Sequence, residues 1–219
     1  MSNKKSNFGF SLLSAVFALV FSFLLYSCAD SEADVVFSAG TVIFDFADEE
    51  TVANTRLAVY VQTSSEVQRA DYFTAENEDS GWIWTVHSPE MFSVDSKQYA
   101  FASNLRSPQG ESIPQGKYNV VYYDAAGKSD EMAFEVKYNK DLLKVKSEKS
   151  PELVPNKTEY LAIYDNQDEL LFMGKRKNNW RDNAAILKDY KIGHKIRVCY
   201  ANPSNTVVCL MPAQLLKEE

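Results

Sequence analysis

Residues 114–136, PQGKYNVVYYDAAGKSDEMAFEV, predict a β-hairpin around which the rest of the fold is arranged. Two alternating runs, expected as strands at about 117–124 and 130–137, flank a turn that contains Gly127. Neighbouring side chains of a strand point to opposite faces, so alternation of apolar and polar residues marks a strand with one buried face. A glycine between two such runs is typical of an antiparallel hairpin.

Five runs before this hairpin extend the same pattern. We expect them as strands at about 40–47, 56–62, 66–74, 82–87 and 98–104. Short strands separated by turn residues predict an antiparallel β-sandwich, whereas βαβ units would need helical runs between the strands. With 13 Phe, 12 Tyr and 3 Trp, the chain also holds many of the aromatic side chains that are enriched in strands. The predicted fold class is mainly β.

The spacing around the hairpin resembles that of immunoglobulin-like and fibronectin type III-like domains. The shared pattern begins at Leu105, continues through Pro114-x-Gly116-x-Tyr118-x-Val120 and ends at Phe134-x-Val136. The resemblance implies an immunoglobulin-like β-sandwich over residues 38–138. Because this sandwich hosts many unrelated functions, the resemblance implies an architecture and no particular activity.

Three aromatic residues acquire expected roles from this resemblance. Tyr118 occupies the place of a tyrosine corner, whose hydroxyl bonds to backbone before the strand. Trp82 or Trp84 occupies the place of the buried tryptophan of a middle strand. The usual cysteines between the two sheets are absent, since no Cys lies between Ala29 and Val198.

The C-terminal third of the chain has a different composition. Residues 139–157 predict a linker, because five lysines and two prolines leave no clean period. Residues 158–219 predict a small β-rich module, in which turn residues separate alternating runs and one stretch holds good helix formers. Its expected elements are hairpins over 160–173 and 194–211 and a helix over 183–188 capped by Asp182.

The N-terminus resembles the type II signal peptide of bacterial lipoproteins. Two lysines precede an apolar run from Phe8 to Tyr26, which ends in Leu25-Tyr26-Ser27-Cys28. The resemblance implies that residues 1–27 are removed and that Cys28 carries a thioether-linked diacylglycerol. The alternative is an uncleaved anchor, because the run of 19 residues approaches the roughly 20 that cross a bilayer. No cluster of Lys or Arg follows the run, which favours cleavage.

Residues 28–37 predict an acidic tether between the lipid and the first domain. In many lipoproteins of this type an Asp directly after the cysteine retains the protein in the inner membrane. Ala29 stands at that place and Asp30 follows it. We therefore expect a lipid-anchored protein of the bacterial cell envelope at the outer membrane, with the periplasmic and the surface leaflet both open.

The charge balance argues against a nucleic-acid partner. The whole chain has 23 basic and 30 acidic residues, and residues 1–27 hold two lysines and no acids. The mature chain then has 21 basic against 30 acidic residues and a net charge of −9. A nucleic-acid-binding protein needs a basic face that replaces phosphate counterions.

Cys199 and Cys209 predict a disulfide across the last hairpin. They lie symmetrically about Ser204, so a turn centred on that residue places them directly opposite each other. A compartment beyond a signal peptide permits oxidation. The alternative is a pair of buried free thiols that serve as small apolar groups.

A basic stretch with an aromatic residue stands out in this acidic chain. It consists of Lys175, Arg176, Lys177, Trp180 and Arg181. Such a loop can contact lipid headgroups or an acidic glycan. The plainer alternative is the charged end of a hairpin.

No motif in the sequence names a reaction. The chain has no Gly-rich phosphate loop, no Gly-x-Ser-x-Gly motif and only two histidines. Carboxylates at 76–79 and 165–169 lack the spacing of a dedicated Ca²⁺ loop, which favours solvated turns. We expect no enzymatic activity, no metal and no cofactor. The predicted function is a binding or adhesion module for a protein or glycan, and the alternative is a structural or accessory subunit of a larger envelope complex.

Overall fold

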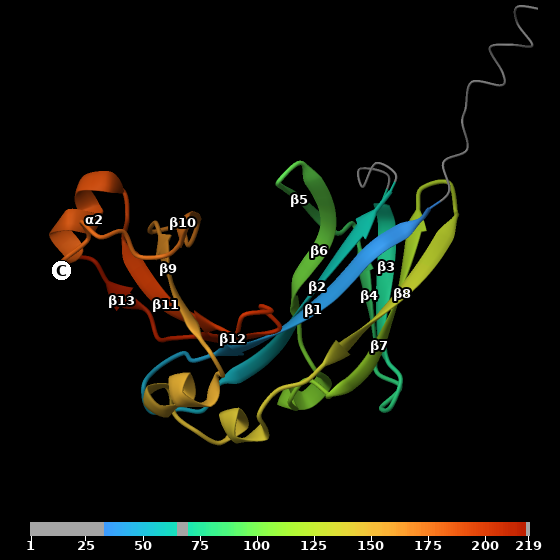
Figure 1. Ribbon diagram of the computed structural model, residues 1–219, viewed down its shortest axis with the longest axis horizontal. Coiled ribbons are helices and arrows are strands. Elements are labelled where there is room, and N and C mark those ends of the chain that lie inside the picture. The colour runs from blue at the N-terminus through green and yellow to red at the C-terminus, as the bar shows by residue number, and fades with distance from the viewer. Residues whose placement is uncertain (1–32, 65–69, 218–219) are drawn as a thin grey trace, which may run out of the picture. The chain divides into compact units, whose positions relative to one another are not determined.

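Residues 33–64 and 70–217 are described by the computed structural model, and they form two β-sheets with short helices (Figure 1). The strands are β1 (Val35–Asp45), β2 (Asn54–Thr63), β3 (Ala70–Asn77), β4 (Ile83–His87), β5 (Glu90–Val94), β6 (Lys97–Leu105), β7 (Gly116–Asp124), β8 (Ser129–Val136), β9 (Thr158–Tyr164), β10 (Leu170–Gly174), β11 (Lys195–Ala201), β12 (Val207–Leu210) and β13 (Gln214–Leu215). The helical segments are η2 (Pro108–Gly110), η3 (Lys140–Leu143), η4 (Ser147–Leu153) and α2 (Asn183–Asp189). The predicted signal peptide 1–27 and the lipid site Cys28 lie outside the described residues. Among the described helices, none has the length and apolar character needed to cross a membrane.

The larger sheet has nine strands and curls into a half-barrel (Figure 1). Eight of them follow the order β10–β9–β11–β12–β1–β2–β6–β5, and β13 pairs with β11. All its pairings are antiparallel except that of β12 with β1. The smaller sheet has the antiparallel order β4–β3–β7–β8. The mainly β class is confirmed, but the larger sheet is longer and more curved than the predicted sandwich requires.

The predicted central hairpin is present as β7 and β8. Tyr118 pairs with Phe134 across it, and Gly127 in the turn has a φ of 78°, a conformation that glycine adopts without strain. The other predicted strands also appear, with shifted ends, and residues 66–69 of the strand predicted at 66–74 lie outside the described residues. Strand β5 was not predicted, because its sequence Glu90–Val94 is short and carries little alternation.

The main core lies between the smaller sheet and the convex face of the larger sheet. The smaller sheet contributes Phe73, Tyr118 and Val120, while β1 and β2 contribute side chains such as Phe44 and Leu57. All five are fully buried. Apolar burial of this extent is the dominant favourable term in folding.

Tyr118 makes the hydrogen bond that was predicted for it. Its hydroxyl donates to the carbonyl of Pro114 at 2.7 Å, just before β7 begins. Burial raises the pKa of this phenol far above its ordinary value, so the hydroxyl stays a donor. Trp84 stacks on the Tyr118 ring at 6.2 Å and donates from Nε1 to the carbonyl of Arg106. Of the two candidate tryptophans, Trp84 is the one that packs on the core.

Two predicted connectors are instead parts of the fold. The predicted linker 139–157 contains η3 and η4, and it buries Leu142 and Val154 against the main core. Its prolines and lysines are compatible with short 3₁₀ turns, which need no apolar period. The described part of the predicted tether 28–37 buries Ala33 and Val35, and β1 already begins at Val35.

The C-terminal strands do not form a separate module. β12 pairs in parallel with β1, from Val42 with Val207 to Asp45 with Leu210, so β9 to β12 extend the larger sheet. The hairpins and the helix predicted within residues 158–219 are nevertheless present. Asp182 caps α2 as predicted, accepting the backbone N–H of Ala185 at 2.7 Å. Residues 33–219 form one compact unit, and the predicted boundary between two domains is therefore not found.

Gly40 is required where β1 passes beside the second strand of the central hairpin. A Cβ at this position would overlap the ring of Phe134, which stacks on Tyr118 with ring centres 5.2 Å apart. We expect Gly40→Ala to lower the free energy of unfolding by about 1–3 kcal/mol, the usual cost of overpacking a core. Urea denaturation of Gly40→Ala, Phe134→Leu and the double variant measures the coupling. If Gly40→Ala costs as much in the Phe134→Leu background as in the wild-type chain, the ring is not what the glycine accommodates.

Candidate binding site

The two faces of the nine-stranded sheet differ in what covers them. On the convex face, the smaller sheet, η3 and η4 cover β1, β2, β6 and β12. Farther along that face, Trp180 and Ile186 pack against Leu161, Ile163 and Ile196 of β9 and β11. No described element packs on the concave face, which is the inside of the half-barrel (Figure 1). The concave face is therefore where the described fold leaves a sheet open to a ligand.

The floor of the half-barrel holds a pocket of about 330 Å³. Its lining comes from β1, β2, β9, β10, β11, β12 and the turn before β12, and consists of Thr41, Tyr60, Tyr160, Met173, Gly174, Cys199, Ala201, Asn205 and Val208. The Thr41 hydroxyl donates to the carbonyl of Asn205 at 2.7 Å. Burial raises the pKa of Tyr60, so its hydroxyl is protonated at neutral pH. A mainly apolar pocket with a few hydroxyl groups is the usual form of a small-ligand site.

Aromatic rings continue from this pocket across β1, β2, β6 and β5. We call Phe37, Tyr60, Phe92, Tyr99 and Phe101 the aromatic platform. Tyr60 stacks on Phe101 with ring centres 6.1 Å apart, and Phe92 lies 5.0 Å from Phe101 and 5.1 Å from Tyr99. Phe37 packs edge-on against Tyr99 with ring centres 6.1 Å apart, and its side chain is 44% exposed. The other four rings are partly exposed, so the platform presents aromatic surface to solvent.

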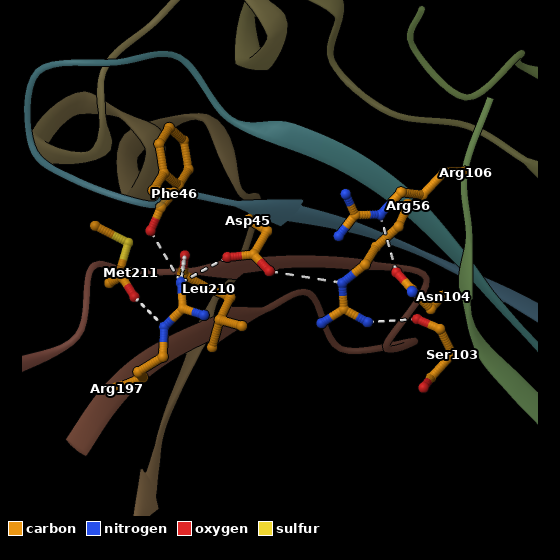
Figure 2. A network of polar contacts seen from close by, with 9 residues as sticks. All are labelled: Asp45, Phe46, Arg56, Ser103, Asn104, Arg106, Arg197, Leu210 and Met211. Atoms are coloured by element: carbon orange, nitrogen blue, oxygen red, sulfur yellow. Dashed lines mark hydrogen bonds and ion pairs between the residues drawn. The ribbon is translucent and has the colours of Figure 1, made fainter. Parts of the chain in front are cut away.

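A polar network lies on the same face, where β1 ends and β2 begins (Figure 2). Asp45 Oδ1 accepts from Arg197 Nη2 at 2.6 Å, and Asp45 Oδ2 lies 3.6 Å from Arg56 Nε. Arg197 also donates to the carbonyls of Phe46 at 2.9 Å and Met211 at 2.7 Å. Arg197 thereby satisfies backbone carbonyls at the ends of β1 and β12, which is a structural role.

The predicted basic loop is divided by the fold into a buried and an exposed part. Trp180 is only 2% exposed and packs edge-on against Phe172 at 5.0 Å, so it belongs to the second core. Lys177 lies over the Trp180 ring at 4.8 Å and forms an ion pair with Asp189. The same carboxylate accepts from Trp180 Nε1 at 2.8 Å. Trp180 was therefore misread as a surface contact.

The charged ends of that loop remain exposed. Lys175, Arg176 and Arg181 are on the surface, and Arg176 donates to the carbonyl of Trp180 at 3.4 Å. This arrangement agrees with the plainer alternative, the charged end of a hairpin. Sequence alone could not separate the two, because a tryptophan among lysines occurs both in cores and at binding surfaces.

The predicted disulfide between Cys199 and Cys209 is not formed, and both are buried free thiols. Cys199 pairs with Leu210, and Tyr200 pairs with Cys209, so the pairing is shifted by one residue from the predicted register and is centred between Ser204 and Asn205. A shift of one residue in the pairing moves a side chain to the other face of the sheet. Cys199 lines the pocket on the concave face, whereas Cys209 belongs to the main core on the convex face.

The described side chains offer little reactive chemistry. Burial raises the pKa of Cys199 to about 11 and that of Cys209 to about 12, so neither thiol is a thiolate at neutral pH. Within residues 33–64 and 70–217, no cluster of three or more His, Cys, Asp or Glu side chains could hold a metal ion. The acidic turn at 165–169 is a hydrogen-bonded turn, in which Asp165 accepts the backbone N–H groups of Gln167 and Glu169.

A second hollow, of about 390 Å³, lies on the other side of the sheet. It is lined by Glu49, Glu50, Lys146, Ser147, Glu148, Val198, Tyr200, Met211, Pro212 and Gln214. One of its carboxylates, Glu50, is already paired with Lys146. Among the described residues, this hollow has one aromatic side chain, Tyr200, and no group of stacked rings beside it. The concave face is therefore the better candidate for a binding site.

Comparison with known proteins adds no family or relative. No family model matches the chain, and neither a curated protein nor a solved structure is similar enough to count as a match.

The aromatic platform was missed at the level of sequence, although its residues were visible. Tyr60, Tyr99 and Phe101 alternate with core residues in predicted strands, so the pattern indicates an outward aromatic face on two of them. Strand β5 was not predicted, and it is this strand that places Phe92 between the Tyr99 and Phe101 rings. Without the pairing of β12 to β1, no sequence signal indicates that this face is concave.

The register of β11 and β12 makes a direct prediction about the thiols. Protein purified without reductant and alkylated under denaturing conditions should carry an alkyl group on both Cys199 and Cys209. Peptide mapping by mass spectrometry reads the two sites separately from Cys28, and a pre-reduced sample is the control. A cross-linked Cys199–Cys209 peptide in the unreduced sample would contradict the register described here.

Proposed function

We propose that this chain is a non-enzymatic binding module that recognises a glycan on the concave face of its nine-stranded sheet. The observation that carries the proposal is the aromatic platform beside the 330 Å³ pocket. The sequence left protein and glycan open as ligands. The concave, hydroxyl-bearing and aromatic character of the site favours the glycan.

Sugar rings suit this surface on physical grounds. A pyranose has an apolar face of C–H groups that packs on an aromatic ring, and a rim of hydroxyls that needs hydrogen-bond partners. Tyr60 and Tyr160 supply both kinds of surface, since each has an apolar ring and a polar tip. The platform rings are carried by strands rather than by loops, so little conformational entropy is lost when a ligand binds.

The proposed architecture of residues 38–138 remains an immunoglobulin-like sandwich. In such a domain, strands A, B, E and D form one sheet, and C′, C, F and G form the other. The orders β1–β2–β6–β5 and β4–β3–β7–β8 correspond to these two sheets strand by strand. The hydrogen bond from Tyr118 to Pro114 also supports this assignment. The C-terminal strands would then be an extension of the A-strand edge.

We propose further that a lipid on Cys28 holds the mature chain at the outer membrane of a bacterial cell envelope. The support is the sequence of residues 1–28. The first described residues enter β1 directly, so the proposed lipid and the folded unit would be separated by few residues. Such a protein would act close to the membrane surface.

A second candidate function, an accessory subunit of a larger envelope complex, has one observation in its favour. Strand β5 is an edge of the larger sheet and exposes Met91 at 44% and Val94 at 49%. An exposed edge strand with apolar side chains can pair with a strand of another protein.

Removal of one platform ring tests the proposed function. We expect Tyr60→Ala in the full mature chain to weaken glycan binding at least tenfold, since the ring joins the pocket to the platform. A glycan array followed by calorimetry on the array hits measures the effect. Tyr72→Ala is the matched control, because Tyr72 stacks on Tyr123 at 4.3 Å on the other sheet. If the chain binds a protein from an envelope extract but binds no glycan, the proposal is wrong.

Metabolic labelling tests the proposed lipid anchor. Labelled palmitate should enter the wild-type protein and should be absent from Cys28→Ala, because that cysteine is the proposed attachment site. Membrane fractionation of the two forms should show the variant released or retained as an unprocessed precursor. Equal labelling of both proteins would rule out lipid attachment at Cys28.

A further inference from the structure

We propose that the saccharide bound on the concave face is acidic, and that Arg56 binds its carboxylate. This inference rests on the proposed glycan-binding function and adds the chemical class of the ligand. No role for Arg56 is predicted from the sequence.

Arg56 and Tyr60 lie on the same face of β2. They are four residues apart, so at about 3.3 Å per residue they are separated by roughly 13 Å along the strand. Arg56 is also directly opposite Ile43 of β1, and directly opposed residues of paired strands share a face. Ile43 packs against the cluster that contains Cys199 of the pocket. Arg56 therefore lies on the same concave face as the platform and the pocket.

The guanidinium of Arg56 is held from two sides and still has free donors. Nε faces Asp45, and Nη1 donates to the carbonyl of Ser103 on β6 (Figure 2). Within the described part of the chain, Nη2 makes no hydrogen bond. The Arg56 side chain is 20% exposed, and Nη2 is not among the buried polar atoms that lack a partner in the described residues. A guanidinium that is held at Nε and Nη1 and has a free Nη2 can donate to a carboxylate.

The charge around Arg56 is not balanced within the network. Among the described residues, Asp45 is the one carboxylate that faces the two arginines, which leaves a net charge of +1. Asp45 lies closer to Arg197, at 2.6 Å, than to Arg56, at 3.6 Å. Arg197 is further satisfied by the carbonyls of Phe46, Leu210 and Met211. The unbalanced positive charge therefore resides mainly on Arg56, and it attracts an anionic group.

The competing interpretation is that Arg56 only ties β1, β2 and β6 together. In that case its removal lowers stability, and the charge of the ligand makes no difference to affinity. The two interpretations thus predict different ratios of affinity for an acidic and a neutral form of one saccharide. This ratio does not depend on the stability of the variant.

The experiment compares oligogalacturonic acid with its methyl-esterified form, which has the same backbone without the charges. We expect the wild-type mature protein to bind the acid at least tenfold more tightly, because only the acid offers a carboxylate that can accept a charge-assisted hydrogen bond from Arg56. Raising the salt from about 50 to about 500 mM should reduce this preference. In Arg56→Gln the preference should fall to about one, while Tyr72→Ala should keep it.

The outcomes separate this inference from the proposed function. Equal affinity of wild type for the acid and the ester would overturn the acidic ligand and leave glycan binding intact. An acid preference that survives in folded Arg56→Gln would overturn the role of Arg56. If Arg56→Gln fails to fold, the ester comparison and its salt dependence on wild type decide whether the ligand is acidic. If neither probe binds but the array shows a neutral glycan that depends on Tyr60, the acidic class is wrong and the proposed function stands.

Discussion

The parallel pairing of β12 with β1 is the interaction on which the rest of the structure depends. Four consecutive residues of β1 align with four of β12 and join the two ends of the described chain in one sheet. Parallel strands need a long crossover connection, and here that connection contains the whole smaller sheet, η3 and η4. Arg197 secures the end of the pairing, because it bonds to Asp45 and Phe46 on one side and to Leu210 and Met211 on the other.

This pairing determines which surface is left for binding. It makes β1 a central strand rather than an edge, and the twist between neighbouring strands then accumulates over the whole sheet. The sheet curls, and its convex face is buried by the smaller sheet, the 3₁₀ helices and the Trp180 cluster. A unit of about 60 residues would be small for a core of its own. By joining the larger sheet, the C-terminal strands share its core and form one side of the concave face.

Local features were predictable from the sequence, and features that depend on distant pairing were not. Alternation located most strands, and local chemistry located the Tyr118 hydrogen bond and the Asp182 cap. The parallel pairing leaves no local signal, since its partners are far apart in the sequence. The disulfide prediction failed because a hairpin turn can shift by one residue, which moved Cys199 and Cys209 to opposite faces. The signal over residues 1–28 is a local pattern, and it stays a prediction.

In the proposed function, the polar network of Asp45, Arg56 and Arg197 on the concave face meets a structural and a binding requirement in one cluster. Burial of an arginine without a partner is costly, and Asp45 offsets that cost first for Arg197, the less exposed of the two arginines. A second buried carboxylate would balance Arg56 but would add its own desolvation cost. Leaving Arg56 partly exposed avoids this cost, because water solvates the remaining charge. The same exposure would make the positive charge of Arg56 available to the proposed ligand. The charge of the proposed site is therefore a consequence of the ion pair by which Asp45 of β1 holds Arg197 of β11.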